Sequence, residues 1–115
     1  MEQKYNNPID IERVKNVDDY EIIICSICNK VYIHPVRCAN CDYHFCKNCI
    51  ENYLVYNPGK CPRCIFFVMK HPSPVQNKAL SRLEIHCFYY PNCTEILQYD
   101  FLLKHEEKCI FNGIL

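Results

Sequence analysis

Apolar residues in this chain recur in short stretches, each long enough for one small helix or strand. The clearest stretch is residues 46–56, where Ile50, Tyr53 and Leu54 fall on one face of a helix. An Asn-Pro-Gly sequence follows at residues 57–59. It should end the helix, because proline cannot continue it and glycine frees the turn. The pattern therefore predicts a helix near the centre of the chain.

Four further stretches predict shorter elements. The consecutive isoleucines at residues 22–24 favour a strand, since β-branched side chains suit extended backbone. Residues 31–33 are also apolar, but a His-Pro pair follows them directly and predicts a loop there. Residues 77–83 have the pattern of a short helix, and so do residues 101–108, for which Asp100 is the expected N-cap.

The first part of the chain, residues 1–19, is polar and mixed in charge. Within it Ile11, Val14 and Val17 recur every third residue. Two structures fit this spacing: a short helix laid against the following unit, or a tail with one docked turn. Further along, residues 71–74 contain two prolines and predict a stiff linker.

Cysteine content changes the picture of how such a chain folds. Half of the 115 residues are hydrophobic, yet a chain this short cannot bury one large core. Structural zinc contributes about 10–16 kcal/mol to the folding of small fingers, and it would supply what the core lacks. A C-x-x-C turn places two thiolates at two corners of a tetrahedron with zinc–sulfur bonds of about 2.3 Å. Four such pairs supply eight ligands, enough for two closed zinc sites; they are Cys25 with Cys28, Cys38 with Cys41, Cys46 with Cys49, and Cys61 with Cys64.

A third set of ligands lies near the end of the chain: Cys87, Cys93, His105 and Cys109. His105 and Cys109 are four residues apart and would lie on the same side of a helix. Three cysteines with one histidine are a common structural zinc set. The 11 cysteines and His105 make twelve ligands, which predicts three zinc ions and leaves no thiol unused.

Charge and hydropathy exclude several classes of partner. The chain has 13 basic and 13 acidic residues and no basic cluster, which argues against nucleic-acid binding. The start has no apolar run typical of a signal peptide, and no stretch has the length of a membrane helix, so we expect no membrane contact. Dense cysteines that bind metal are typical of a reducing compartment, which predicts a cytoplasmic location with the nucleus as the alternative.

The order and spacing of the four cysteine pairs resemble those of a RING domain. The sequences "DDYEIIICSICNKVYIHPVRC" and "HFCKNCIENYL" are similar to RING sequences, and "NKALSRLEIHCFYYPNCTEILQYDFLLKHEEKC" is similar to a TRAF-type zinc finger. The resemblance implies a cross-brace. The first and third pairs, Cys25, Cys28, Cys46 and Cys49, would share one zinc, and the second and fourth pairs, Cys38, Cys41, Cys61 and Cys64, would share the other.

The expected fold is therefore a small zinc-stabilised α+β protein, a cross-brace RING followed by a TRAF-type finger with three cysteine ligands and one histidine. The expected organisation is a polar segment at 1–19, a RING-like domain with two zincs at 20–68, a linker and short helix at 69–84, a TRAF-type finger with one zinc at 85–110, and a tail at 111–115.

One departure from the RING pattern concerns the usual histidine ligand. That histidine stands three residues before the fifth ligand, and here the position is Tyr43, with His44 one residue later. We assign Cys38 and Cys41 to the second zinc, because His44 as a ligand would leave one of them unused. The alternative is that His44 replaces one of the two. Three other histidines lack a partner pair and are expected at the surface or behind a ligand: His34, His71 and His86.

The resemblance implies a RING-type E3 ubiquitin-protein ligase module, which binds a ubiquitin-charged E2 enzyme and promotes transfer to a substrate lysine. Its zincs would be coordinatively full, so catalysis would be templating by proximity, without a catalytic nucleophile. The residues that match the E2-binding groove of the family are Ile27, Tyr53 and Pro62. The alternative is a non-catalytic zinc-binding adaptor or structural subunit of a larger assembly.

Two apolar flanks and one substitution refine these expectations. Residues 22–24 and 65–69 flank the RING, and they would either form a homodimer or partner contact or pack the RING against the finger. Active RING ligases often carry an arginine or lysine directly after the last ligand, to hold ubiquitin and E2 together. Here that position is Ile65, which predicts modest ligase activity.

Overall fold

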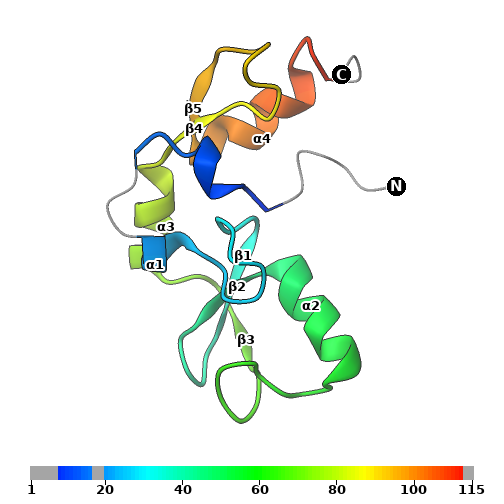
Figure 1. The fold of residues 1–115 in the computed structure, drawn as a ribbon. Coiled ribbons are helices and arrows are strands. Elements are labelled where there is room, and N and C mark those ends of the chain that lie inside the picture. Colours follow the sequence, from blue (N-terminus) through cyan, green and yellow to red (C-terminus); the bar gives the residue numbers. More distant parts are fainter. Residues whose placement is uncertain (1–7, 17–19, 113–115) are drawn as a thin grey trace.

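The computed structural model describes residues 8–16 and 20–112, and the backbone alone for residues 20 and 21. In Figure 1 the chain forms two lobes stacked along the long axis of a molecule that measures 45 × 33 × 19 Å. The elements in chain order are η2 (Ile11–Arg13), α1 (Tyr20–Ile23), β1 (Pro35–Cys38), β2 (His44–Cys46), α2 (Lys47–Tyr56), β3 (Met69–Lys70), α3 (Pro74–Ser81), β4 (Glu84–His86), β5 (Ile96–Gln98) and α4 (Tyr99–Lys108). No helix in the described part of the chain is long and apolar enough to span a bilayer.

The first lobe is built on a three-stranded antiparallel sheet in the order β2-β1-β3. Pro35 pairs with Cys46 and Arg37 pairs with Lys70, so β1 is the central strand. The predicted central helix is observed as α2, which follows β2 directly. Ile50 on α2 is fully buried, and so is Phe45 on β2, which means that the helix and the sheet share one core.

The second lobe consists of the hairpin β4–β5 and the helix α4, and α3 connects it to the first lobe (Figure 1). The predicted helix at 77–83 is observed, but it begins earlier, at Pro74. Ser73 is its N-cap and accepts a hydrogen bond from the backbone of Gln76 at 3.2 Å. Pro74, the second proline of the expected linker, therefore starts a helix, because proline suits the first helical position.

Both lobes bury residues in a single hydrophobic cluster. Leu80 of α3, Ile85 of β4 and Leu102 of α4 belong to the same cluster as Val31 and Phe45 of the first lobe. The hydroxyl of Tyr99 donates a hydrogen bond of 2.7 Å to the backbone oxygen of Tyr32 across the junction. The segment at 69–84 thus joins two units that pack on each other.

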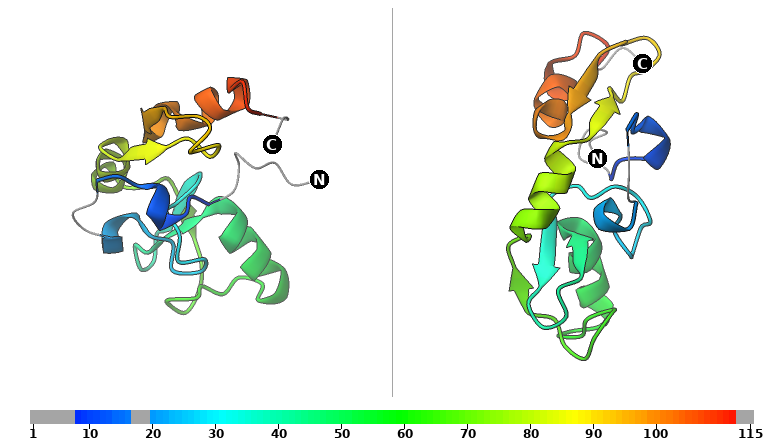
Figure 2. Two further views of the ribbon diagram at one scale, coloured as in Figure 1. Left: turned by 45° about the horizontal axis from the view of Figure 1, so that its top comes forward. Right: turned by 90° about the vertical axis from the view of Figure 1, so that its left-hand side faces the viewer.

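Residues 8–16, which we call the strap, lie across the junction between the lobes (Figure 2). At one end Ile9 pairs with Val31 of the first lobe, and at the other Val14 pairs with Ile85 of the second. Only Ile11–Arg13 form a helical turn. Of the two predicted alternatives the docked turn is observed, although Val17 lies outside the described residues.

Two predictions for local structure are wrong, and a third is right only in part. Residues 22–24 are not a strand: Ile22 and Ile23 belong to α1, which packs against α3, and only Ile24 is extended, in a single β-bridge with Val31. Residues 31–33 lie in the predicted loop, with their side chains buried, but the loop ends at His34, because the strand β1 begins at Pro35. The N-cap of α4 is Gln98, and Asp100 lies in the first turn.

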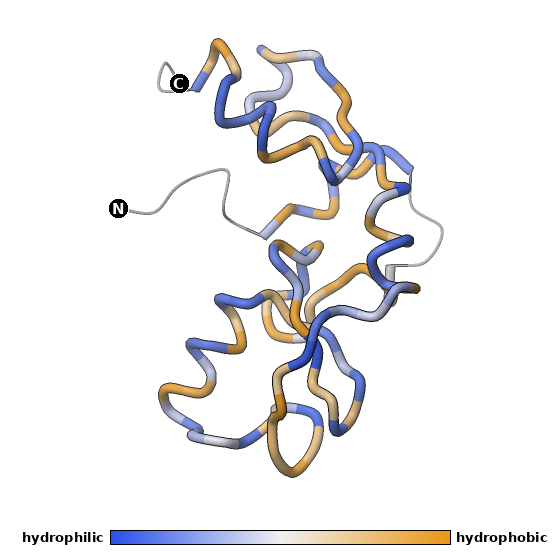
Figure 3. Tube along the Cα trace, turned by 180° about the vertical axis from the view of Figure 1, so that it is seen from behind, coloured by the Kyte–Doolittle hydropathy of each residue, from blue (hydrophilic) through white to orange (hydrophobic). Residues whose placement is uncertain are grey.

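The second apolar flank, residues 65–69, lies on the surface. Ile65 is 83% exposed and Phe66 is 50% exposed, whereas Phe67 packs edge-on against Phe45 with ring centroids 6.2 Å apart. Figure 3 shows this apolar loop at the tip of the first lobe, away from the core. Of the two flanks this one is the more exposed, since Ile23 is buried and Ile22 and Ile24 are half-buried.

Candidate metal centres

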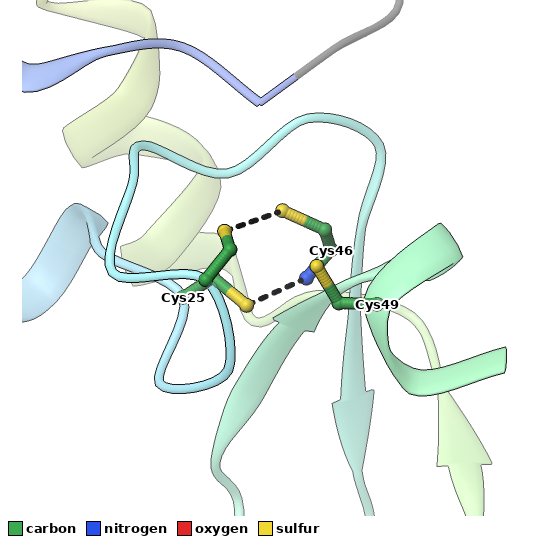
Figure 4. Close-up of side chains that lie close together, drawn as sticks. Cys25, Cys46 and Cys49 are labelled. Carbon is green, nitrogen blue, oxygen red and sulfur yellow. Dashed lines mark hydrogen bonds between the residues drawn. The ribbon is translucent and has the colours of Figure 1, made fainter. Parts of the chain in front are cut away.

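The first centre brings together Cys25, Cys28, Cys46 and Cys49, whose sulfur atoms lie within 4.8 Å of one another. Cys46 ends β2 and Cys49 lies in the first turn of α2, so the junction between strand and helix fixes the positions of both cysteines. Figure 4 shows Cys25, Cys46 and Cys49 pointing toward one another. The backbone N–H of Ile27 and that of Cys46 each donate to the Cys25 sulfur at 3.4 Å. Such donors stabilise a thiolate.

The second centre brings together Cys38, Cys41, Cys61 and Cys64. The sulfur atoms of Cys38 and Cys64 are 3.7 Å apart, and so are those of Cys41 and Cys61. A tetrahedron with metal–sulfur bonds of about 2.3 Å has edges of about 3.8 Å. The two centres use alternate cysteine pairs along the chain, which is the predicted cross-brace.

The third centre lies in the second lobe and brings together Cys87, Cys93, His105 and Cys109. The Cys87 and Cys109 sulfurs are 3.9 Å apart, and the Cys93 sulfur is 3.4 Å from Nε2 of His105. The hairpin supplies the first two ligands, while α4 carries the histidine and ends beside the last cysteine. Ligands from the β4–β5 hairpin and from the C-terminal half of α4 therefore meet at one site.

The electrostatics of these groups fit a divalent cation. A hydrogen bond with the Cys46 thiol lowers the pKa of Cys25 to about 5, although burial acts in the other direction, and the same interaction raises the pKa of Cys46. Burial raises the pKa of Cys41, Cys49 and Cys87 to about 12. The donors of one group can therefore all become thiolates only when a cation compensates their charge. A closed set of four sulfur or nitrogen donors is what structural Zn²⁺ prefers.

His44 lies outside the second centre. Its Nε2 accepts a hydrogen bond of 3.1 Å from the backbone N–H of Ser73, and its side chain is 7% exposed. Burial lowers the pKa of His44, which favours the neutral imidazole that this acceptor role requires. The histidine thus holds the segment that leads into α3, and all four ligands of the second centre are cysteines.

The other three histidines lie apart from the ligand sets. His34 and His71 are exposed. His86 is half-buried next to the ligand Cys87, and its ring contacts that of Tyr90 in a tilted arrangement with centroids 4.3 Å apart.

The three residues expected to contact an E2 enzyme are all half-buried: Ile27 in the first cysteine loop, Tyr53 on α2 and Pro62 after the seventh ligand. Arg63 stacks on the ring of Tyr43 at 4.3 Å from the centroid and donates to its hydroxyl at 3.0 Å. The Arg63 guanidinium is therefore already held by Tyr43, next to the second centre.

Sequence reasoning missed a buried ion pair behind the third centre. Arg13 of the strap binds the carboxylate of Glu106, which is 1% exposed, and donates two hydrogen bonds to the backbone oxygen of His86. The same carboxylate accepts from the backbone N–H of Phe88 at 2.6 Å. Burial raises the pKa of Glu106, and Arg13 opposes that effect. An arginine in a polar tail carries no sequence signal for this role, since its partner is 93 residues away.

Comparison with known proteins yields one family and several relatives. Residues 25–64 match the zinc finger of C3HC4 type (RING finger), although this chain has cysteine at all eight positions. E3 ubiquitin-protein ligase NRDP1 of Xenopus laevis is 32% identical over 108 residues, which cover 90% of this chain and 33% of the relative. The Homo sapiens protein of that name is 31% identical with the same coverage. E3 ubiquitin-protein ligase SINAT2 of Arabidopsis thaliana is 31% identical over 94 residues, 80% of this chain and 29% of the relative. The chain thus spans about one third of these relatives.

Proposed function

Because residues 25–64 are a RING finger, we propose that the chain binds a ubiquitin-charged E2 enzyme and promotes transfer of ubiquitin to a substrate lysine. The observation that carries this proposal is the interleaved pairing of the first two centres, in which the first and third cysteine pairs meet and the second and fourth pairs meet. The similarity to proteins named ubiquitin ligases extends over both lobes and supports the same function.

The mechanism of this function is templating. All 11 cysteines lie in the three centres, so none is left to carry ubiquitin as a thioester. A zinc ion with four protein ligands has no open position at which to activate water. What the chain contributes is a rigid surface that holds the E2 thioester near the acceptor amine, and effective concentration then speeds the reaction.

The proposed E2 surface consists of Ile27, Tyr53 and Pro62. We expect Ile27→Ala to weaken E2 binding at least about tenfold, because a central apolar anchor supplies much of the energy of a small interface. Lysine-dependent discharge of ubiquitin from the E2 should fall in parallel. Binding is measured by titration calorimetry and discharge by single-turnover gel assay, with a panel of E2 enzymes.

Phe101→Ala is the matched control, because this residue is 57% exposed on α4 in the other lobe. This variant should change neither the affinity for the E2 nor the rate of ubiquitin discharge. Wild-type chain that binds no E2 in the panel would refute the proposal and favour the adaptor function.

One observation favours the adaptor as the second candidate. Ile65 follows the last RING ligand and is 83% exposed, so no hydrogen-bond donor occupies that position, and Arg63 is engaged by Tyr43. A surface of this kind can bind an E2 and still leave its ubiquitin mobile. Protein that binds an E2 without stimulating discharge would be an adaptor.

We expect Ile65→Arg to speed discharge about tenfold, the rate equivalent of one hydrogen bond to a charged group. Affinity for the E2 itself should change little, since the new donor would act on ubiquitin. Ile65→Met controls for the change of shape without adding a donor. A wild-type rate already equal to that of an arginine-bearing RING would contradict the expectation.

The three centres would hold three zinc ions per chain. Native mass spectrometry should show the mass of the chain plus three zincs, and a metal assay after protease digestion should agree. A count of two, or a mass that indicates a disulfide, would contradict this number.

The same mass spectrum reports the oligomeric state. We propose that the exposed loop at 65–69 mediates homodimer formation, since four of its five residues are exposed and apolar. Phe66→Glu should return a dimer to the monomer, and a wild-type chain that is monomeric would refute this part of the proposal. Reduced thiols suit the cytoplasm or nucleus, where we place the protein.

A further inference from the structure

A groove of about 700 Å³ runs over the first lobe at the junction between the sheet and the start of α2. Its lining comes from the turn before β1, from β1 itself, from the first residue of α2 and from β3; the residues are His34, Pro35, Val36, Lys47, Met69, Lys70 and His71. None of the residues proposed for E2 contact lines it. Along α2, Lys47 is six residues from Tyr53, about 120° away around the helix axis. The groove and the proposed E2 surface are therefore separate.

The groove carries positive charge that the protein does not neutralise. Among the described residues, Lys47 and Lys70 form no ion pair, and both are exposed. His34 and His71 add two further nitrogen-bearing rings to the same lining. Two acidic residues lie nearby: Glu51 lines a neighbouring hollow that shares Lys47, and Asp100 lines another that shares Pro35. Neither of them lines the groove itself. This concentration is local, because the chain as a whole has no net charge.

The placement of Lys47 works against the stability of α2. It is the first residue of the helix, whose first turn contains no acidic side chain. The positive end of the helix dipole makes a lysine there unfavourable and an anion favourable. Lys47 disfavours the helix but adds positive charge to the groove, which indicates that this position serves binding.

The floor of the groove is apolar and built on fixed backbone. Pro35 and Val36 lie on the central strand, and Met69 beside them is 48% exposed. The turn at His34 has φ +48° and its backbone oxygen accepts from the N–H of Lys47 at 3.0 Å, which fixes the two ends of the lining relative to each other. The backbone oxygen of His71 accepts from the guanidinium of Arg37 at 3.1 Å. An apolar floor with a basic rim suits a peptide with both apolar and acidic side chains.

We propose that this groove docks an acidic peptide segment of a partner protein, with its carboxylates against Lys47 and Lys70 and its apolar side chains on Pro35, Val36 and Met69. Nucleic acid fits less well, because phosphates gain nothing from the apolar floor. Docking here leaves the E2 surface free. The inference stands independently of ligase activity.

The test uses the full chain loaded with zinc and a fluorescein-labelled peptide of alternating glutamate and leucine. Fluorescence anisotropy should show binding that weakens with salt, and a peptide with lysine in place of glutamate should not bind. Lys70→Glu and Lys47→Glu should each weaken binding at least about tenfold, because a favourable charge contact becomes a repulsive one. Lys104→Glu, an exposed lysine on α4, is the control with the same change of net charge.

Amide shifts in ¹H–¹⁵N spectra locate the site and confirm that each variant is folded. The expected result is a set of peptide-induced shifts at Val36, Lys47, Lys70 and His71, with those at Ile27 unchanged and with binding unaffected by added E2. Shifts elsewhere, equal loss of affinity in the Lys104→Glu control, no binding at about 1 mM peptide, or tighter binding of a single-stranded RNA oligonucleotide would each overturn the proposal.

Discussion

Replacement of His105 by alanine is expected to remove the third zinc and unfold the second lobe. Structural zinc contributes on the order of 10–16 kcal/mol in small fingers, more than the apolar contacts of one hairpin and one helix can replace. The mass of the native protein should fall by one zinc, and the amide signals of residues 85–112 should collapse to the centre of the spectrum.

The same substitution should also weaken the RING lobe. Ile85 and Leu102 lie in one buried cluster with the core of the first lobe, so their loss removes part of the packing that this core shares with the second lobe. We expect the RING to keep its two zincs but to melt at a lower temperature than in wild type. Lys104→Ala, on the exposed side of α4, should leave the zinc content and the melting temperature unchanged. A variant that still holds three zincs would show that His105 is not a ligand.

Arg13→Ala is expected to reduce the free energy of unfolding by about 3–5 kcal/mol, because it leaves a buried carboxylate without its cation. Glu106 is 1% exposed, and among the described residues the backbone N–H of Phe88 would be left as its hydrogen-bond partner. Removal of Arg13 also deprives the backbone oxygen of His86 of two donors. Urea unfolding followed by circular dichroism measures the change.

A second variant separates the buried charge from the loss of packing. Arg13→Met with Glu106→Gln removes both charges and keeps most of the volume, so it should regain much of the stability that Arg13→Ala loses. Lys30→Ala is the control for an ion pair at the surface, since Lys30 and Asp10 are each about half exposed, and it should cost about 1 kcal/mol or less. Equal effects of Arg13→Ala and Lys30→Ala would contradict the role assigned to the buried pair.

The metal centres were predictable from the sequence because their signal is local. A C-x-x-C pair makes its own turn, and the spacing of His105 and Cys109 follows from one helix. The pairing between distant cysteines came from the family resemblance, and the sulfur positions agree with it. His44 is not among the four side chains gathered at the second centre, and its Nε2 accepts from the backbone of Ser73 instead.

Prediction failed where packing at long range overrides a local preference. The isoleucines at 22–24 favour a strand by propensity, but Ile22 and Ile23 belong to a helix that packs against α3, and only Ile24 is extended. The prolines at 72 and 74 suggested a linker that keeps the two units apart, yet Pro74 is the first residue of a helix that carries Leu80 into the shared core. Nothing in the sequence near Arg13 indicates Glu106, since the pair exists only in the folded chain.

The position of the strap has a consequence for the order in which the chain assembles during synthesis. All eight RING ligands lie within residues 25–64, so both of its zincs can bind while the rest of the chain is still being made. The strap leaves the ribosome before the RING does, but Arg13 and Glu106 are 93 residues apart, and it cannot close until α4 has emerged. Closing so long a loop costs conformational entropy that only the completed second lobe returns. The strap, although it is made before the RING, is therefore the last of these elements to settle, and its closure adds a second connection to the core that the two lobes share.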